Sequence, residues 1–152
     1  MPLDILVVDD EHDIRELVAG VLEDEGYETR SAANSDATLE AIATPGHTSN
    51  HICFALKEEN ALFSGDHIMG WSTTVVSPPD GDMTAYMESL ELVKARKFDI
   101  LWPTHGPPVL KVEPFIDAYI AHRRAREAQV VKAVGEGHGK IKDMVPVLYA
   151  EV

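Results

Sequence analysis

The first 33 residues fit one arrangement of secondary structure, a strand followed by a helix and a second strand. Residues 3–10 read LDILVVDD, an apolar run that is typical of a strand buried on both faces and that ends in two carboxylates. Gly26 is suited to the position just after a helix, and residues 27–33 predict a short strand. Between the first predicted strand and Gly26, apolar residues recur at helical spacing, at Ile14, Leu17, Val18, Val21 and Leu22. The chain therefore opens with a predicted β-α-β unit.

Length and composition indicate one soluble domain. The chain has 152 residues, of which 45% are hydrophobic and 7% aromatic, which is enough for one packed core of α/β type. No apolar run reaches the length that spans a bilayer, and the N-terminus lacks the pattern of a signal peptide. Cys53 is the single cysteine, so an internal disulfide is excluded. We expect a cytoplasmic protein without a membrane partner.

The charge of the chain argues against nucleic acid as a partner. The formal net charge is −13, and residues 1–36 alone hold 11 acidic and 2 basic side chains. Such a chain repels phosphate backbones. The one basic cluster, HRRAR at residues 122–126, is more typical of a solvated helix face than of a binding patch.

Residues 4–42 resemble the start of a response-regulator receiver domain, close to the nitrogen-regulation type. In that family an acidic pair after the first strand helps to bind Mg²⁺, and the resemblance gives this role to Asp9 and Asp10. Hard oxygen ligands at the end of a strand are also suited to such a cation. However, a receiver needs a third strand that ends in the phosphorylated aspartate, and none is recognisable after Ile42.

Three short motifs in the rest of the chain carry candidate metal ligands. They are TPGHT at residues 44–48, SGD at 64–66 and PTHGP at 103–107, each after an apolar run and next to a glycine. These motifs resemble the second half of a metallo-β-lactamase-fold hydrolase of the β-lactamase-like or glyoxalase II-like kind, from about residue 37 to the end. The resemblance makes His47, Asp66 and His105 metal ligands, and imidazole and carboxylate groups suit zinc.

The main metal motif of that family, H-x-H-x-D-H, is absent from the chain. The resemblance therefore implies an incomplete zinc site, in which activation of the catalytic water is lost. The stretch VVDDEHDI occupies an equivalent place between a strand and a helix. Asp9, Asp10, His12 and Asp13 are possible additional ligands there, although carboxylates at a helix N-terminus are more commonly surface groups.

Other segments predict the frame around these motifs. A helix is expected after Asp82 as its N-cap, a buried strand over residues 98–103, a long helix from Pro114 and a short helix near the end. His51 and His67 lie beside motif residues, and packing or solvation is the expectation for both. The loop with Trp71 is expected to border the metal cleft.

The fold expected from both resemblances is a layered α/β sandwich with a mixed sheet covered by helices. The receiver-like segment spans residues 1–36 and the hydrolase-like half spans residues 37–152, in one compact folded unit. Residues 37–43 fit either a helix or a strand, and we favour the strand because the hydrolase-like half continues without interruption. Residues 34–36, NSD, then form a turn.

The function expected from this pattern is that of a chimera with no intact native activity and a partial metal site. One alternative is a weak metal-dependent hydrolase of the esterase, thioesterase or lactamase type. A second is a receiver-like signalling module without a phosphoacceptor. No catalytic residue is assigned beyond the metal ligands. A half-sandwich leaves an apolar face uncovered, so we also expect a homodimer, with or without exchanged segments.

Overall fold

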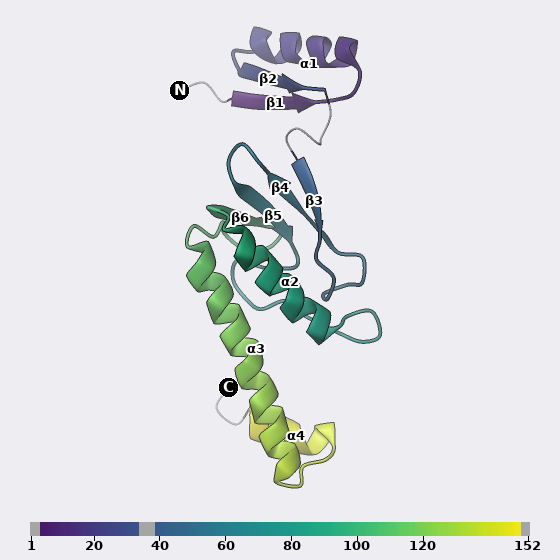
Figure 1. The fold of residues 1–152 in the computed structure, drawn as a ribbon, viewed down its shortest axis with the longest axis vertical. Coiled ribbons are helices and arrows are strands. Elements are labelled where there is room, and N and C mark those ends of the chain that lie inside the picture. Colours follow the sequence, from purple (N-terminus) through teal and green to yellow (C-terminus); the bar gives the residue numbers. More distant parts are fainter. Residues whose placement is uncertain (1–3, 34–38, 150–152) are drawn as a thin grey trace.

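The computed structural model describes residues 4–33 and 39–149 (Figure 1). None of the helices in these ranges is both long enough and apolar enough to cross a membrane. In chain order the elements are β1 Asp4–Val8, α1 His12–Asp24, β2 Glu28–Ala32, β3 Leu39–Ala43, β4 Ile52–Leu56, β5 Ala61–Gly65, α2 Met83–Arg96, β6 Ile100–Pro103, α3 Val112–Gly135 and α4 Ile141–Leu148.

The predicted β-α-β unit is confirmed. β1 and β2 pair in parallel over their full length, and α1 packs on one side of them. Gly26 follows α1 with φ +89°, a left-handed conformation that suits glycine at a helix end. The unit lies at one end of the molecule, away from the other strands (Figure 1).

The remaining strands form a four-stranded mixed sheet in the order β3-β4-β5-β6. β4 is antiparallel to both β3 and β5, whereas β6 runs parallel to β5. The strand expected for residues 37–43 is confirmed over Leu39–Ala43. The turn expected at 34–36 lies outside the described residues. One expectation needs correction: β1 and β2 form a separate sheet instead of joining the mixed one, because they pair with each other.

Helices α2 and α3 cover one face of the mixed sheet and enclose the core. Asp82 is the N-cap of α2 as expected, since its side chain accepts a hydrogen bond of 2.8 Å from the backbone N–H of Ala85. The apolar side of α2 packs toward strands β5 and β6. The fully buried apolar residues of this core include Leu62, Ile68, Tyr86, Leu90, Val93, Leu101 and Ile116.

The opposite face of the mixed sheet is apolar and uncovered. Strand alternation places on this face residues that are all apolar, while Ile42, Cys53, Ala55, Leu62 and Leu101 point into the core on the other side. Phe54, Phe63 and Trp102 stand side by side across three strands and are 46%, 45% and 42% exposed. The exposed and half-buried residues of this face are Leu39, Ala41, Ala43, Ile52, Phe54, Leu56, Phe63, Ile100 and Trp102, while Ala61 on the same side of β5 is fully buried.

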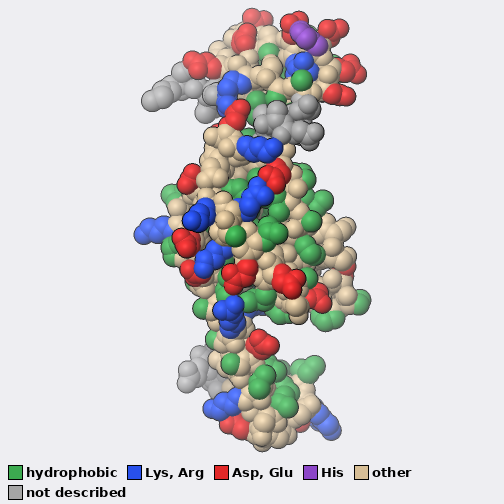
Figure 2. Space-filling model, viewed as in Figure 1, with side chains coloured by type: hydrophobic (Ala, Val, Ile, Leu, Met, Phe, Trp, Pro, Cys, Tyr) green, Lys and Arg blue, Asp and Glu red, His purple; other side chains and the backbone are tan. Residues whose placement is uncertain are grey.

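The β1-α1-β2 unit is the most acidic and the least packed part of the chain. Figure 2 shows acidic side chains gathered over this unit. α1 contains no buried residue, and its apolar Leu17 and Val21 are 68% and 57% exposed. Two strands and one helix form a small core, so this unit contributes less to the stability of the fold than the mixed sheet does.

Candidate metal site

The loop that carries His47 is held against the start of α2. Gly46 has φ +135°, and a Cβ at this position would lie 2.3 Å from the Cα of Tyr86, so the backbone packs directly on the helix. The backbone N–H of Asp82 donates to the Gly46 carbonyl over 2.9 Å, and the Ser89 hydroxyl donates to the Pro45 carbonyl over 2.8 Å. The glycine of TPGHT is therefore required by packing.

The imidazole of His47 is oriented by a backbone carbonyl. Its Nδ1 lies 2.6 Å from the carbonyl oxygen of Val75. A carbonyl only accepts, so Nδ1 carries the proton and Nε2 presents a lone pair. This Nε2 lies 3.9 Å from Oδ2 of Asp66. The ring is thus in the tautomer that a metal ligand requires.

Asp66 follows directly on the end of β5, after Gly65, whose φ of +55° turns the chain out of the strand. Its Oδ1 is buried and, within the part of the chain that the structure describes, has no hydrogen-bond partner. The Thr74 hydroxyl donates to its main-chain carbonyl over 2.6 Å and holds the following loop. A buried carboxylate oxygen without a hydrogen-bond donor is a strong acceptor.

His105 approaches the same carboxylate from the loop after β6. Its Nε2 lies 3.5 Å from Oδ1 of Asp66. The ring of Trp71 lies parallel to the imidazole, within 1°, with the ring centroids 6.3 Å apart. The two loops meet at Gly70 and Gly106, where the N–H of Gly70 donates to the His105 carbonyl over 2.8 Å and a Cβ on either glycine would clash.

The donor types suit a zinc ion, but their spacing matches it only in part. Two ligand atoms on one tetrahedral zinc are separated by about 3.4 Å, since each bond is about 2.0–2.2 Å long. The separation of 3.5 Å between His105 Nε2 and Asp66 Oδ1 matches this, and the 3.9 Å for His47 is somewhat longer. Yet among residues 4–33 and 39–149 no group of three or more His, Cys, Asp or Glu side chains is arranged so that it could hold a metal ion. The three side chains converge without completing a metal shell.

The possible additional ligands are not brought to this place. Oδ1 of Asp9 accepts a hydrogen bond of 2.8 Å from the N–H of Glu11, and His12 pairs with Glu16 within α1. Asp9, Asp10 and His12 all lie on the β1-α1-β2 unit, at the end of the molecule away from the candidate site (Figure 1). The structure therefore does not bring them to His47, in agreement with the interpretation of these side chains as surface groups at a helix N-terminus. The reason is that the β1-α1-β2 unit does not dock on the mixed sheet.

Two further histidines, for which packing or solvation was expected, lie beside the site. His67 is fully buried, and burial lowers its pKa to about 3. Neither ring nitrogen has a hydrogen-bond partner among the described residues, and the ring packs edge-on against Tyr86. His51 is half-buried, with its ring centroid 6.1 Å from that of His47. Burial, followed by the charge of His47, lowers the pKa of His51, while Asp66 opposes this shift.

Two residues of α3 support the loops of the site: Tyr119, and Arg123 from the basic cluster at 122–126, which was expected to be a solvated helix face. The hydroxyl of Tyr119 accepts from the N–H of Met69 over 3.1 Å and donates to carbonyls of the same loop, while Arg123 donates to the carbonyl of Thr74. Burial raises the pKa of Tyr119 to about 12, so the hydroxyl keeps its proton. Their helical position carried no signal of this role, because the loop they hold is about 50 residues away in sequence.

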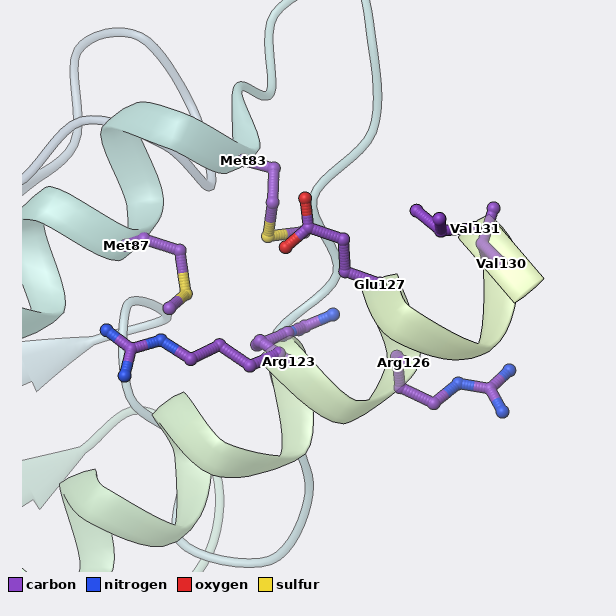
Figure 3. Close-up of a pocket in the computed structure, with 8 residues that line it drawn as sticks. Met83, Met87, Arg123, Arg126, Glu127, Val130 and Val131 are labelled. Carbon is purple, nitrogen blue, oxygen red and sulfur yellow. The ribbon is translucent and has the colours of Figure 1, made fainter. Parts of the chain in front are cut away.

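Two hollows flank α3. One, of about 290 Å³, borders Trp71 and is closed by Phe115, Tyr119 and His122. The other has a similar volume and lies between α2 and α3. Figure 3 shows Met83 and Met87 of α2 pointing toward Arg123 and Glu127 of α3 in this second hollow. Only the first hollow adjoins a ring that contacts the His105 imidazole.

The fold and the motifs define a class of protein. The chain belongs to the metallo-beta-lactamase superfamily, whose family model matches residues 6–105.

Relatives within that class are longer than this chain. The chain is 44% identical over 121 residues to the beta-lactamase-like protein 2 homolog of Caenorhabditis elegans, a match that covers 80% of this chain and 38% of that protein. It is 42% identical over 94 residues to the thioesterase pkgB of Emericella nidulans, covering 62% of this chain and 26% of that protein. The chain therefore spans less than half the length of these relatives.

The fold is shared with a solved beta-lactamase domain protein from Burkholderia ambifaria. The two structures align with a TM-score of 0.60 at 21% identity, over 95% of this chain and 53% of the other. A coverage of 95% includes most of the β1-α1-β2 unit, and the family match begins inside β1. The expectation of a receiver domain joined to half a hydrolase finds no support in these comparisons.

Proposed function

We propose that this chain is a weak metal-dependent hydrolase of ester or thioester bonds. The observation that carries the proposal is the convergence of two imidazole Nε2 atoms on the carboxylate of Asp66, at 3.5 and 3.9 Å. Membership of the metallo-beta-lactamase superfamily supports the same chemistry. Thioesters are favoured as substrates because one relative is named a thioesterase.

In this proposal His47, Asp66 and His105 hold one zinc ion. When bound, the ion supplies a Lewis acid for the substrate carbonyl and lowers the pKa of a water ligand. The chain's own groups orient the two histidines and receive the substrate. The Val75 carbonyl keeps the His47 Nε2 lone pair directed at the site, and the ring of Trp71 keeps His105 in place. The hollow beside Trp71 is positioned to receive the acyl part of a substrate.

The activity is expected to be weak because the donor set is small. Three protein donors suffice for one catalytic zinc, which leaves no ligands for a second ion. The absence of H-x-H-x-D-H from the sequence agrees with a single weakly held ion.

A chain with the superfamily's fold but without catalysis is the second candidate. The observation that favours it is the lack, among the described residues, of a group of side chains that could hold a metal ion. In that case the three motifs are remnants, as the expectation of a chimera without native activity implied.

Metal content and thioester hydrolysis of the purified chain separate these candidates. We expect about one zinc per chain after dialysis against micromolar zinc, with hydrolysis of an aryl thioester that a chelator abolishes. His47→Ala and Asp66→Ala should abolish both zinc binding and hydrolysis. Lys132→Ala, a change at an exposed position on α3, should leave both unchanged. Absence of zinc, or hydrolysis that survives both site variants, overturns the proposal.

A further inference from the structure

We propose that the hollow between α2 and α3 is a binding site for a small apolar amino acid in its zwitterionic form. The hollow has a volume of about 290 Å³, at the small end of the range for ligand pockets, so it suits a molecule of that size. It is lined by α2 and α3 alone and contains none of the three candidate metal ligands. Binding at this place therefore does not depend on the function proposed above.

The apolar wall of the hollow comes from both helices. Met83 and Met87, one helical turn apart on α2, point into the space between the helices (Figure 3). Val130 and Val131 line the hollow from α3, and they are 40% and 64% exposed. Methionine side chains adapt to partners of different shape. This wall is therefore suited to a short apolar side chain.

Two opposite charges on α3 line the same hollow, and neither has an ion partner among the described residues. Arg123 and Glu127 are four residues apart, so they lie on one face of the helix. Arg123 donates to the carbonyl of Thr74, and its guanidinium lies 5.4 Å from the centre of the Tyr86 ring. Its Nε is buried and, in the part of the chain that the structure describes, has no hydrogen-bond partner. An anion in the hollow would stabilise this half-buried guanidinium, which lacks a counter-charge.

The other arginines of the hollow already have partners. Arg124 pairs with Glu91 over 3.3 Å, and Arg126 donates to the side chain of Gln129 over 2.7 Å. The charges left over are one cation and one carboxylate, which match the carboxylate and the ammonium group of an amino acid. A fatty acid would place its charge close to the unpaired carboxylate, and an amine would place its charge close to the unpaired guanidinium.

Isothermal titration calorimetry of the full chain with L-leucine, L-methionine and L-phenylalanine tests this proposal. We expect one site per chain and a sub-millimolar dissociation constant for at least one of these amino acids. The analogue of the tightest binder that lacks the ammonium group, and its methyl ester, should each bind at least about tenfold more weakly, because each leaves one charge unpaired. If none of the three amino acids binds, or if the analogue without the ammonium group binds as tightly, the proposal is overturned.

Substitution of the exposed carboxylate of the hollow tests the ammonium contact. Glu127→Gln should weaken binding at least about tenfold, because the ammonium group of the ligand loses its counter-charge. Glu136→Gln, at the C-terminal end of α3 and outside the hollow, is the matched control and should bind like the parent. Equal affinities of the two variants would refute the proposed contact.

A measurement on the parent protein guards against misfolded variants. With ¹³C-labelled methionine methyl groups, the bound amino acid should shift the resonances of Met83 and Met87 and leave that of Met144, on α4, in place. Saturable binding that leaves the Met83 and Met87 resonances unshifted would place the ligand elsewhere and overturn the proposal.

Discussion

At the scale of single residues, Gly46 meets two demands that other amino acids do not. Its φ is +135°, and a Cβ would meet the backbone of Tyr86 at 2.3 Å. Gly46→Ala should therefore lower the free energy of unfolding by about 3 kcal/mol or more, through strain and overpacking together. Urea denaturation measures this. Gly135→Ala, at a helical position with open space around it, should change stability little, and equal losses in both variants would contradict the account.

The buried imidazole of His67 leads to a prediction of how the stability of the fold depends on pH. Burial lowers its pKa to about 3, whereas the unfolded ring takes up a proton below about 6.5. Between these values the unfolded state binds more protons than the folded state, so stability falls as the pH drops from 6.5 toward 3. His67→Leu should reduce the slope of the free energy of unfolding against pH by up to about 1.4 kcal/mol per pH unit. Urea midpoints at several pH values measure the slope, and parallel profiles would contradict the prediction.

At the scale of elements, Asp82 links the start of α2 to the candidate site. Its side chain caps the helix through Ala85, and its N–H holds the carbonyl of Gly46. Asp82→Ala should cost about 1 kcal/mol of stability, while Asp82→Asn retains the cap and should cost a few tenths. Urea denaturation of the two variants tests this, and equal losses would show that the cap is not the cause.

Local signals predicted the elements well, and the expected layered α/β fold is confirmed. The cap at Asp82, the glycine at position 26 and the strand at Leu39–Ala43 all follow from short-range pattern. The separate sheet of β1 and β2 was not predictable, because pairing between distant strands leaves no local trace.

The sequence predicted the three candidate ligands of the site, but it did not predict the contacts that hold them in place. Glycines beside His47, Asp66 and His105 marked three turns, and the structure brings these side chains together. The contacts that hold them, from Val75 and Tyr119, come from loops and helices whose residue types are ordinary.

At the scale of the whole molecule, the mixed sheet has one apolar face that no described element covers. The apolar face of β3-β4-β5-β6 bears no charged strand residue, and such faces are normally covered in parallel and mixed sheets. We propose that a second copy covers it, because two flat apolar sheets stack face to face about a two-fold axis.

Light scattering with size-exclusion chromatography tests the dimer. The parent should show twice the chain mass of 16.7 kDa. Phe63→Glu places a charge in the centre of the face and should give a monomer, whereas Val131→Glu, on the exposed side of α3, should leave the dimer intact. A monomeric parent at micromolar concentration would contradict the proposal.

The central proposal is that the three side chains of the candidate site hold one metal ion. The most direct measurement is an anomalous difference map from crystals of the chain grown with zinc. We predict one peak within about 2.0–2.2 Å of Nε2 of His47 and His105 and of the Asp66 carboxylate, since these are the bond lengths of zinc. A map with no peak there, or with its strongest peak at Asp9 and Asp10, would contradict the account.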